Sequence, residues 1–202
     1  MKQPKPPART GRPRSFDEDE ALERAMTIFW QKGYEATSVS DLTAALGISP
    51  PSLYAAFGNK ESLFERVLTR YANGPARYVI DALAAPTARE VAERRLHGAV
   101  EATCDPSRPR GCLAVQAAAR SADPSSSVVQ KLVAFCDRAH VAYVKRFERA
   151  RKEGDLPKAA DPAALARYVS TVAQGISIQA ASGARRAELR QVAAIALRCW
   201  PE

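Results

Sequence analysis

A short segment between two glycines, GISPPSLYAAFG (47–58), sets the tightest limit on the fold of this chain. Ser49 can cap a helix here, and Pro50 suits the first helical position, where no backbone N–H is needed. Leu53 and Phe57 lie one helical turn apart and can face inward together. A helix of about two turns is marginal in water, so neighbouring helices must hold it in place. The segment is therefore predicted to be a short, supported helix with an exposed outer face.

The residues before this segment have the pattern of another helix. Ser38 and Asp41 resemble a capping box, with Asp41 in the position usually held by Glu or Gln. Gly47 suits the left-handed conformation that commonly ends a helix. A helix, a tight turn with glycine and a second short helix form the helix-turn-helix pattern, whose second helix enters the DNA major groove. We expect this motif at residues 38–57.

The rest of the chain is also predicted to be helical. Apolar residues recur at helical spacing between Leu22 and Trp200, without extended strand-like alternation. Glycine, proline and capping residues divide this pattern into about nine or ten helices. The sequence therefore predicts an all-α fold, with an N-terminal three-helix helix-turn-helix domain followed by a C-terminal helical domain.

The charge of the chain favours an anionic partner. It carries 30 Lys and Arg residues against 22 Asp and Glu residues, a formal net charge of +8. Nucleic acid is the first expectation and an acidic membrane the second. The first fifteen residues are rich in proline and basic residues, which predicts a flexible arm. Within it, Arg12 and Arg14 can enter a narrow minor groove, although an unstructured solubilising tail fits the sequence equally well.

The cysteines indicate a cytoplasmic protein. The four cysteines show no metal-ligand or CxxC spacing, and the N-terminus lacks the apolar stretch of a secretory signal. Cys104 and Cys112 flank an arginine-containing loop, where positive charge would lower a thiol pKa. They are either small buried side chains or redox-sensing thiols. We expect no metal site, cofactor or catalytic activity, because the sequence shows no ligand spacing, catalytic set or glycine-rich phosphate loop.

Three stretches carry a resemblance to a known family: GRPRSFDEDEAL (11–22), FWQKGYEATSVSDLTAALGIS (29–49) and SLYAAFGNKESLF (52–64). Together they resemble the DNA-binding part of the tetracycline-repressor (TetR) family of transcriptional regulators. The motifs Arg110-Gly111-Cys112-Leu113 and Gln174-Gly175-Ile176 resemble one branch of that family.

The resemblance implies a homodimer that represses from a palindromic operator and is released by a small-molecule effector. It divides the chain into three parts, the basic flexible arm (1–15), a DNA-binding domain (16–75) and an effector-binding and dimerisation domain (76–202). The effector cannot be identified from the sequence. Its signal is expected to travel through the helix that begins at Asn59, because that helix joins the two domains.

The resemblance also places DNA contacts on named residues. The family's phosphate-contacting positions fall on Thr37, Ser38, Tyr54 and Lys60. Hydroxyl, phenol and ammonium groups are suitable phosphate donors, although Tyr54 could be a core aromatic and Lys60 a solvated lysine. The outward residues of the short helix are expected to be Pro50, Pro51, Ser52, Ala55 and Ala56. None can make a bidentate contact to a base, so apolar contact with thymine methyl groups fits their chemistry.

The last two helices, at about residues 162–182 and 186–200, are expected to form the dimer interface. Their apolar residues are expected to form more surface than one small domain can cover: Leu165, Val169, Val172, Ile176, Leu189, Ala196 and Trp200. Two alternatives without operator binding stay open. One is a small-molecule-binding or redox-sensing helical protein. The other is a basic membrane-surface protein, suggested by the many Lys and Arg residues at 126–152.

Overall fold

The computed structural model describes residues 16–121, 123 and 125–201, so the predictions for Arg12, Arg14 and the arm lie outside the described residues. Over the described part of the chain the fold consists of ten α-helices and one 3-10 helix, without a strand. The all-α prediction is confirmed. The first four helices are α1 (Glu18–Lys32), α2 (Val39–Leu46), α3 (Pro50–Phe57) and α4 (Lys60–Asn73).

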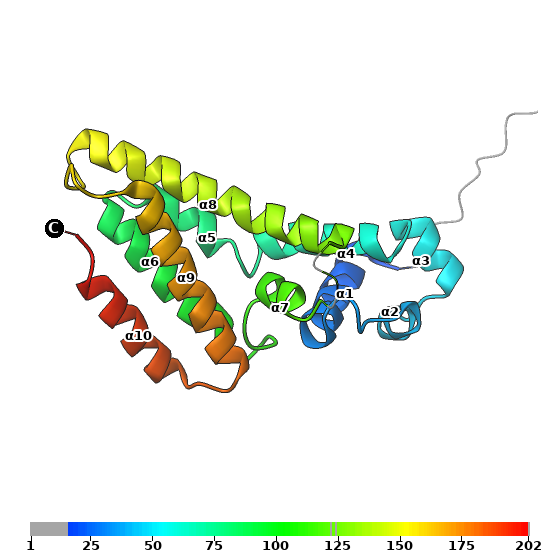
Figure 1. The fold of residues 1–202 in the computed structure, drawn as a ribbon. Coiled ribbons are helices and arrows are strands. Elements are labelled where there is room, and N and C mark those ends of the chain that lie inside the picture. The colour runs from blue at the N-terminus through cyan, green and yellow to red at the C-terminus, as the bar shows by residue number, and fades with distance from the viewer. Residues whose placement is uncertain (1–15, 122, 124, 202) are drawn as a thin grey trace, which may run out of the picture.

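The remaining helices follow after Gly74. They are α5 (Tyr78–Asp81), the 3-10 helix η1 (Ala82–Ala84), α6 (Ala88–Thr103), α7 (Leu113–Ala119), α8 (Ser127–Glu153), α9 (Pro162–Ala181) and α10 (Arg186–Arg198). Figure 1 shows α1 to α4 at one end of an elongated molecule and α6, α9 and α10 at the other. The long helix α8 runs between the two ends, and α7 lies between α1 and α9.

Local capping explains where the N-terminal helices begin and end. The side chains of Asp17, Ser38, Ser49 and Asn59 each accept a backbone N–H bond at the start of α1, α2, α3 and α4. Gly47 ends α2 in the left-handed conformation at φ 67°, which favours glycine. The helix-turn-helix predicted from these residues is therefore confirmed.

The described part of the chain has two apolar cores. The N-terminal core is built on α1 to α4, with Phe29 and Phe64 at its centre, 5.0 Å apart between ring centroids. It does not stop at the predicted boundary near residue 75. Buried residues of α7 and α8 complete it: Leu113, Ala114, Ala117, Val128 and Leu132. The DNA-binding half is thus packed together with helices that follow it in the sequence.

The C-terminal core is built on α6, α8, α9 and α10, and it corrects the predicted dimer surface. Five of the seven predicted interface residues lie buried in this core: Val169, Ile176, Leu189, Ala196 and Trp200. Leu165 and Val172 are half-buried against it. The five buried side chains cannot form a dimer surface, because other helices of the same chain already cover them, whereas dimerisation through the last two helices stays a prediction.

Candidate nucleic-acid interface

The start of α2 is fixed by a capping box between Ser38 and Asp41. Asp41 N donates to Ser38 Oγ at 3.0 Å, and Ser38 N donates to Asp41 Oδ2 at 2.9 Å. Lys32 Nζ donates to the other carboxylate oxygen at 2.6 Å. The bonds from Lys32 and from Ser38 hold the pKa of Asp41 well below its usual range. Ser38 is exposed at this helix N-terminus, and its phosphate contact stays a prediction.

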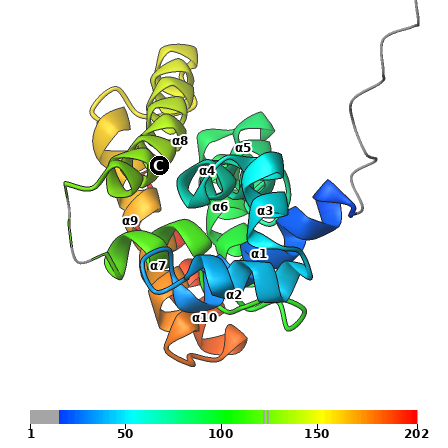
Figure 2. The same ribbon diagram turned by 90° about the vertical axis from the view of Figure 1, so that its right-hand side faces the viewer.

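The outer face of α3 is exposed as predicted. Leu53 and Phe57 are buried, whereas the Tyr54 side chain on the other face is 48% exposed. Pro50, Pro51 and Ala55 are also exposed, and Ser52 is half-buried with its Oγ 2.9 Å from Ser49 Oγ. Figure 2 views the end of the molecule at which α2 and α3 lie. The helix therefore presents a small, mostly apolar surface with one phenol at its edge.

Arg66 of α4 holds α3 in place, a role that the sequence analysis missed. Its guanidinium lies 4.9 Å from the centroid of the Phe57 ring and donates to Ala56 O at 3.3 Å. It also donates to Glu18 of α1 at 2.8 Å. These contacts join residues that are distant in sequence, and helical periodicity gives no signal for them. Arg66 thereby fixes the angle between α1, α3 and α4.

Lys60 has structural contacts where a phosphate contact was predicted. Its Nζ donates to Tyr34 O at 3.1 Å and to Thr37 O at 3.0 Å. The same ammonium lies 4.2 Å from the centroid of the Tyr34 ring. Two of its three N–H groups are thus used by the loop between α1 and α2. Its main observed role is to hold that loop, and a phosphate contact would have to use the remaining N–H.

Thr37 corrects the prediction of a side-chain phosphate contact. The residue is fully buried, and its Oγ1 donates to Gly33 O at 2.6 Å. A phosphate cannot reach a hydroxyl in the interior of this loop. The threonine instead closes the turn that follows α1, because its side chain satisfies a carbonyl at the helix end.

A second candidate site is a cavity of about 360 Å³ in the C-terminal half. Helices α4, α5, α6, α7, α8 and α9 all contribute to its wall. Most of the lining is apolar or aromatic, including Tyr71, Val79, Val115, Phe135 and Tyr143. Its volume falls within the range of about 300–1,000 Å³ that is usual for small-molecule sites.

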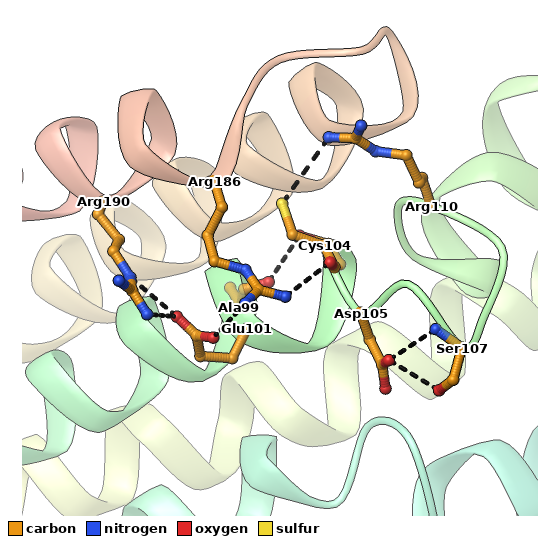
Figure 3. A network of polar contacts seen from close by, with 9 residues as sticks. Ala99, Glu101, Cys104, Asp105, Ser107, Arg110, Arg186 and Arg190 are labelled. Atoms are coloured by element: carbon orange, nitrogen blue, oxygen red, sulfur yellow. Dashed lines mark hydrogen bonds and ion pairs between the residues drawn. The ribbon is translucent and has the colours of Figure 1, made fainter.

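The two cysteines considered for redox sensing have different surroundings. Cys112 lines the cavity, and Tyr71 Oη donates to its Sγ at 3.2 Å. Cys104 lies at the end of α6, where Arg110 Nη2 is 4.0 Å from its Sγ and Arg186 donates to its carbonyl at 2.8 Å (Figure 3). Both are free thiols. Redox sensing by either one stays a prediction.

Figure 3 also shows how α10 is attached to α6. Arg190 donates to Glu101 at 2.8 Å and Arg186 lies 3.6 Å from the same carboxylate.

Within the described residues, His, Cys, Asp and Glu side chains form no group of three that could hold a metal ion. Each helix in that part of the chain also falls short of the length or apolar character that a bilayer-spanning segment needs.

Comparisons with known proteins match both halves of the chain. Residues 21–67 match the model of bacterial regulatory proteins of the tetR family, and residues 92–197 match the tetracyclin repressor-like C-terminal domain. The HTH-type transcriptional repressor ComR of Escherichia coli strain K12 is 35% identical over 195 residues, covering 95% of this chain and 92% of ComR. The repressor BdcR of the same strain is 51% identical over 73 residues, covering 36% of this chain and 37% of BdcR.

Solved structures of regulators share the fold. A cysteine mutant of the TetR family transcriptional regulator CifR, complexed with 26-base-pair double-stranded operator DNA, has a TM-score of 0.89 and 42% identity. The match covers 94% of this chain and 100% of that one. A TetR regulator from Rhodococcus sp. RHA1 has a TM-score of 0.62 and 44% identity, covering 92% and 100%. With both family models matched and a full-length relative above 30% identity, the chain belongs to the TetR family of DNA-binding transcriptional regulators.

Proposed function

We propose that this protein is a dimeric repressor that binds a palindromic operator through α3 and leaves it when a small molecule occupies the cavity. The observation that carries the proposal is the outer face of α3, exposed at Pro50, Pro51 and Ala55 and fixed from behind by Arg66. The operator-bound structure of the CifR mutant, 42% identical to this chain, supports the same use of the fold.

Within this proposal, α3 lies in the major groove. Pro50, Pro51, Ser52 and Ala55 face the bases, where their chemistry suits contact with thymine methyl groups. Ser38 and the phenol of Tyr54 donate to phosphates beside the groove and fix the orientation of the helix. Sequence discrimination by such a surface depends in part on DNA shape.

A dimer supplies two copies of α3 to a two-fold operator. Exposed apolar residues on α9 and α10 offer the surface for it: Ile178 at 48%, Val192 at 45% and Ile195 at 53% exposure. Gly175 lies on the same side of α9, and a side chain built on it would meet nothing within 4 Å. A glycine in mid-helix costs about 1 kcal/mol relative to alanine, and close approach of a second helix gives it a use.

The relatives are transcriptional regulators, and we assign this protein no catalytic activity. We place it in the cytoplasm, where it would meet chromosomal DNA. Regulation by a ligand is supported by the cavity, because its wall includes Tyr71 at the end of α4. That ring also packs edge-to-face on Trp30 of α1 at 5.1 Å, inside the DNA-binding half.

Selection of bound genomic fragments, followed by titration of a recovered operator, tests the proposal. The Tyr54→Phe variant removes only a hydroxyl and should weaken operator binding by about 0.5–1.5 kcal/mol in a fluorescence anisotropy titration. Tyr168→Phe is the matched control, since Tyr168 Oη donates to Ala196 O far from α3. Recovery of no preferred fragment would sink the operator proposal, and equal affinity of both variants would remove Tyr54 from the interface.

A further inference from the structure

We infer that the effector is a compact apolar carboxylate whose carboxylate group pairs with Arg95 inside the cavity. The inference rests on the proposed regulation by a ligand of this cavity. It adds the chemical class of that ligand and the residue that recognises it.

The charges of the cavity wall point to an anion. Two arginines, Arg95 and Arg138, line the cavity, and no Asp or Glu does. Arg95 lies on α6 and is half-buried. Its Nη1 donates to the hydroxyl of Tyr78 at 3.2 Å, and the guanidinium lies 5.3 Å from the centroid of the same ring. A cation placed against apolar walls without a carboxylate is costly unless a ligand supplies the charge.

Arginines that line the neighbouring groove differ from Arg95, because they pair with carboxylates. A groove of about 550 Å³ beside α1 and α4 is lined by Arg66 and Arg70, among others. Arg66 pairs with Glu18 at 2.8 Å, and Arg70 pairs with Glu23 at 2.8 Å and Asp19 at 2.9 Å. Over the described residues Arg95 has no ion pair of this kind. Apart from the bond from Nη1 to the Tyr78 hydroxyl, its N–H donors can therefore serve a planar acceptor.

The remainder of the wall defines the body of the ligand. Four aromatic rings line the cavity, from Tyr71, Tyr78, Phe135 and Tyr143. Small apolar side chains, mostly of alanine and valine, make up much of the remaining wall, with Ser170, Gln174 and Ser177 as its uncharged polar members. An apolar or aromatic body of small size fits a volume of about 360 Å³. A carboxylate matches the guanidinium fork with two parallel hydrogen bonds, whereas a neutral amide cannot accept both in the same way.

Isothermal titration calorimetry on the full chain without DNA tests the inference. The probes are benzoate and phenylacetate, each compared with its neutral amide. Because hydrogen bonds to a charged group contribute about 1.5–3 kcal/mol, each acid should bind about 10- to 100-fold more tightly than its amide. The ratio of acid affinity to amide affinity is measured on the wild type, so this test does not depend on the folding of any variant. Equal binding of acid and amide, or no detectable binding of either acid, would overturn the inference.

Variants of α6 locate the recognition. Arg95→Met should reduce acid binding by the same factor and leave amide binding unchanged. Arg94→Met is the matched control, because Arg94 is exposed on the same helix outside the cavity wall. Thermal unfolding and operator titration establish that each variant is folded. Unchanged acid binding by folded Arg95→Met would overturn the role of Arg95 in recognising the carboxylate. If the wild type binds the acids but binds no operator, only the proposed repressor function fails.

Discussion

The ammonium group of Lys60 holds the loop that leads into α2. Two carbonyls accept from it, and the Tyr34 ring lies beneath it. A lysine in the first turn of a helix opposes the helix dipole, so its presence requires a compensating contact. The sequence showed that such a contact was needed, but a phosphate and a protein carbonyl satisfy an ammonium equally well. The partner could be identified only from the path of the loop.

Replacing Lys60 should therefore affect stability. In Lys60→Met the two carbonyls lose their donor, which should lower the free energy of unfolding by about 1–3 kcal/mol in urea denaturation. Lys145→Met is the control, since Lys145 is exposed on α8. Unchanged stability together with a smaller salt dependence of operator binding would instead restore the phosphate role.

Asp41 should make the stability of the fold depend on pH, and its contacts determine the direction of that dependence. Its pKa is lowered in the folded protein, first by the bond from Lys32 and then by the bonds from Ser38. A carboxyl group of this kind stabilises the fold above its unfolded pKa, and the contribution is lost as the pH falls through the folded value. Asp41→Asn should therefore have a lower melting temperature than the wild type at neutral pH.

The difference between Asp41→Asn and the wild type should narrow in strongly acidic buffer, as thermal melts across a pH series would reveal. Glu35→Gln serves as the control, because Glu35 is exposed and forms no ion pair within the described chain. A difference that stayed constant down to the lowest pH would show that Asp41 contributes through packing or polarity, and its ionisation would carry no stability.

At the scale of whole helices, features set by neighbouring residues can be predicted from the sequence, whereas features set by distant packing cannot. The caps at Ser38, Ser49 and Asn59 and the turn at Gly47 depend on neighbouring residues, so the sequence predicted them correctly. The exposed apolar face of α9, to which we assign the partner, could not be found in this way. Both sides of α9 carry apolar residues, and which side is free depends on where α6 and α8 pack.

Exposed residues of α10 should control dimerisation. Val192→Glu places a charge on the apolar surface that we assign to the partner, so sedimentation velocity should detect monomers. Ala194→Glu is matched in chemistry and exposure but lies on another side of the helix. Ile176→Glu should instead unfold the chain, because Ile176 is 1% exposed in the core. Dimers of unchanged strength for Val192→Glu would exclude this surface.

At the scale of the whole molecule, some of the helices that line the cavity also belong to the N-terminal core. The helices α4, α7 and α8 line the cavity and also contribute to the N-terminal core. Lys131 of α8 pairs with Glu61 and Glu65 of α4, which adds a polar connection. The sequence predicted transmission through α4 alone. In the structure, α7 and α8 also contact both the cavity and the N-terminal core, through distant packing that has no local signature in the sequence.

A cavity ligand and the operator should each weaken the binding of the other by the same factor. If a cavity ligand lowers operator affinity by some factor, the operator must lower ligand affinity by the same factor, because the coupling free energy is shared. Calorimetric titration of phenylacetate with and without operator, and anisotropy titration of operator with and without phenylacetate, give the two ratios. Equal ligand affinity in both states would show that the cavity has no control over DNA binding.

The packing of α7 and the start of α8 against the first four helices limits the modularity of this regulator. A fragment ending at residue 75 would leave the N-terminal core without Leu113, Ala117 and Leu132. We expect such a fragment to lack a cooperative melt in circular dichroism, in contrast to the full chain. Exchange of the C-terminal half between relatives would therefore need a junction other than the loop after α4. A chimera that keeps this core intact would have to carry α7 and the first turns of α8 along with the first four helices.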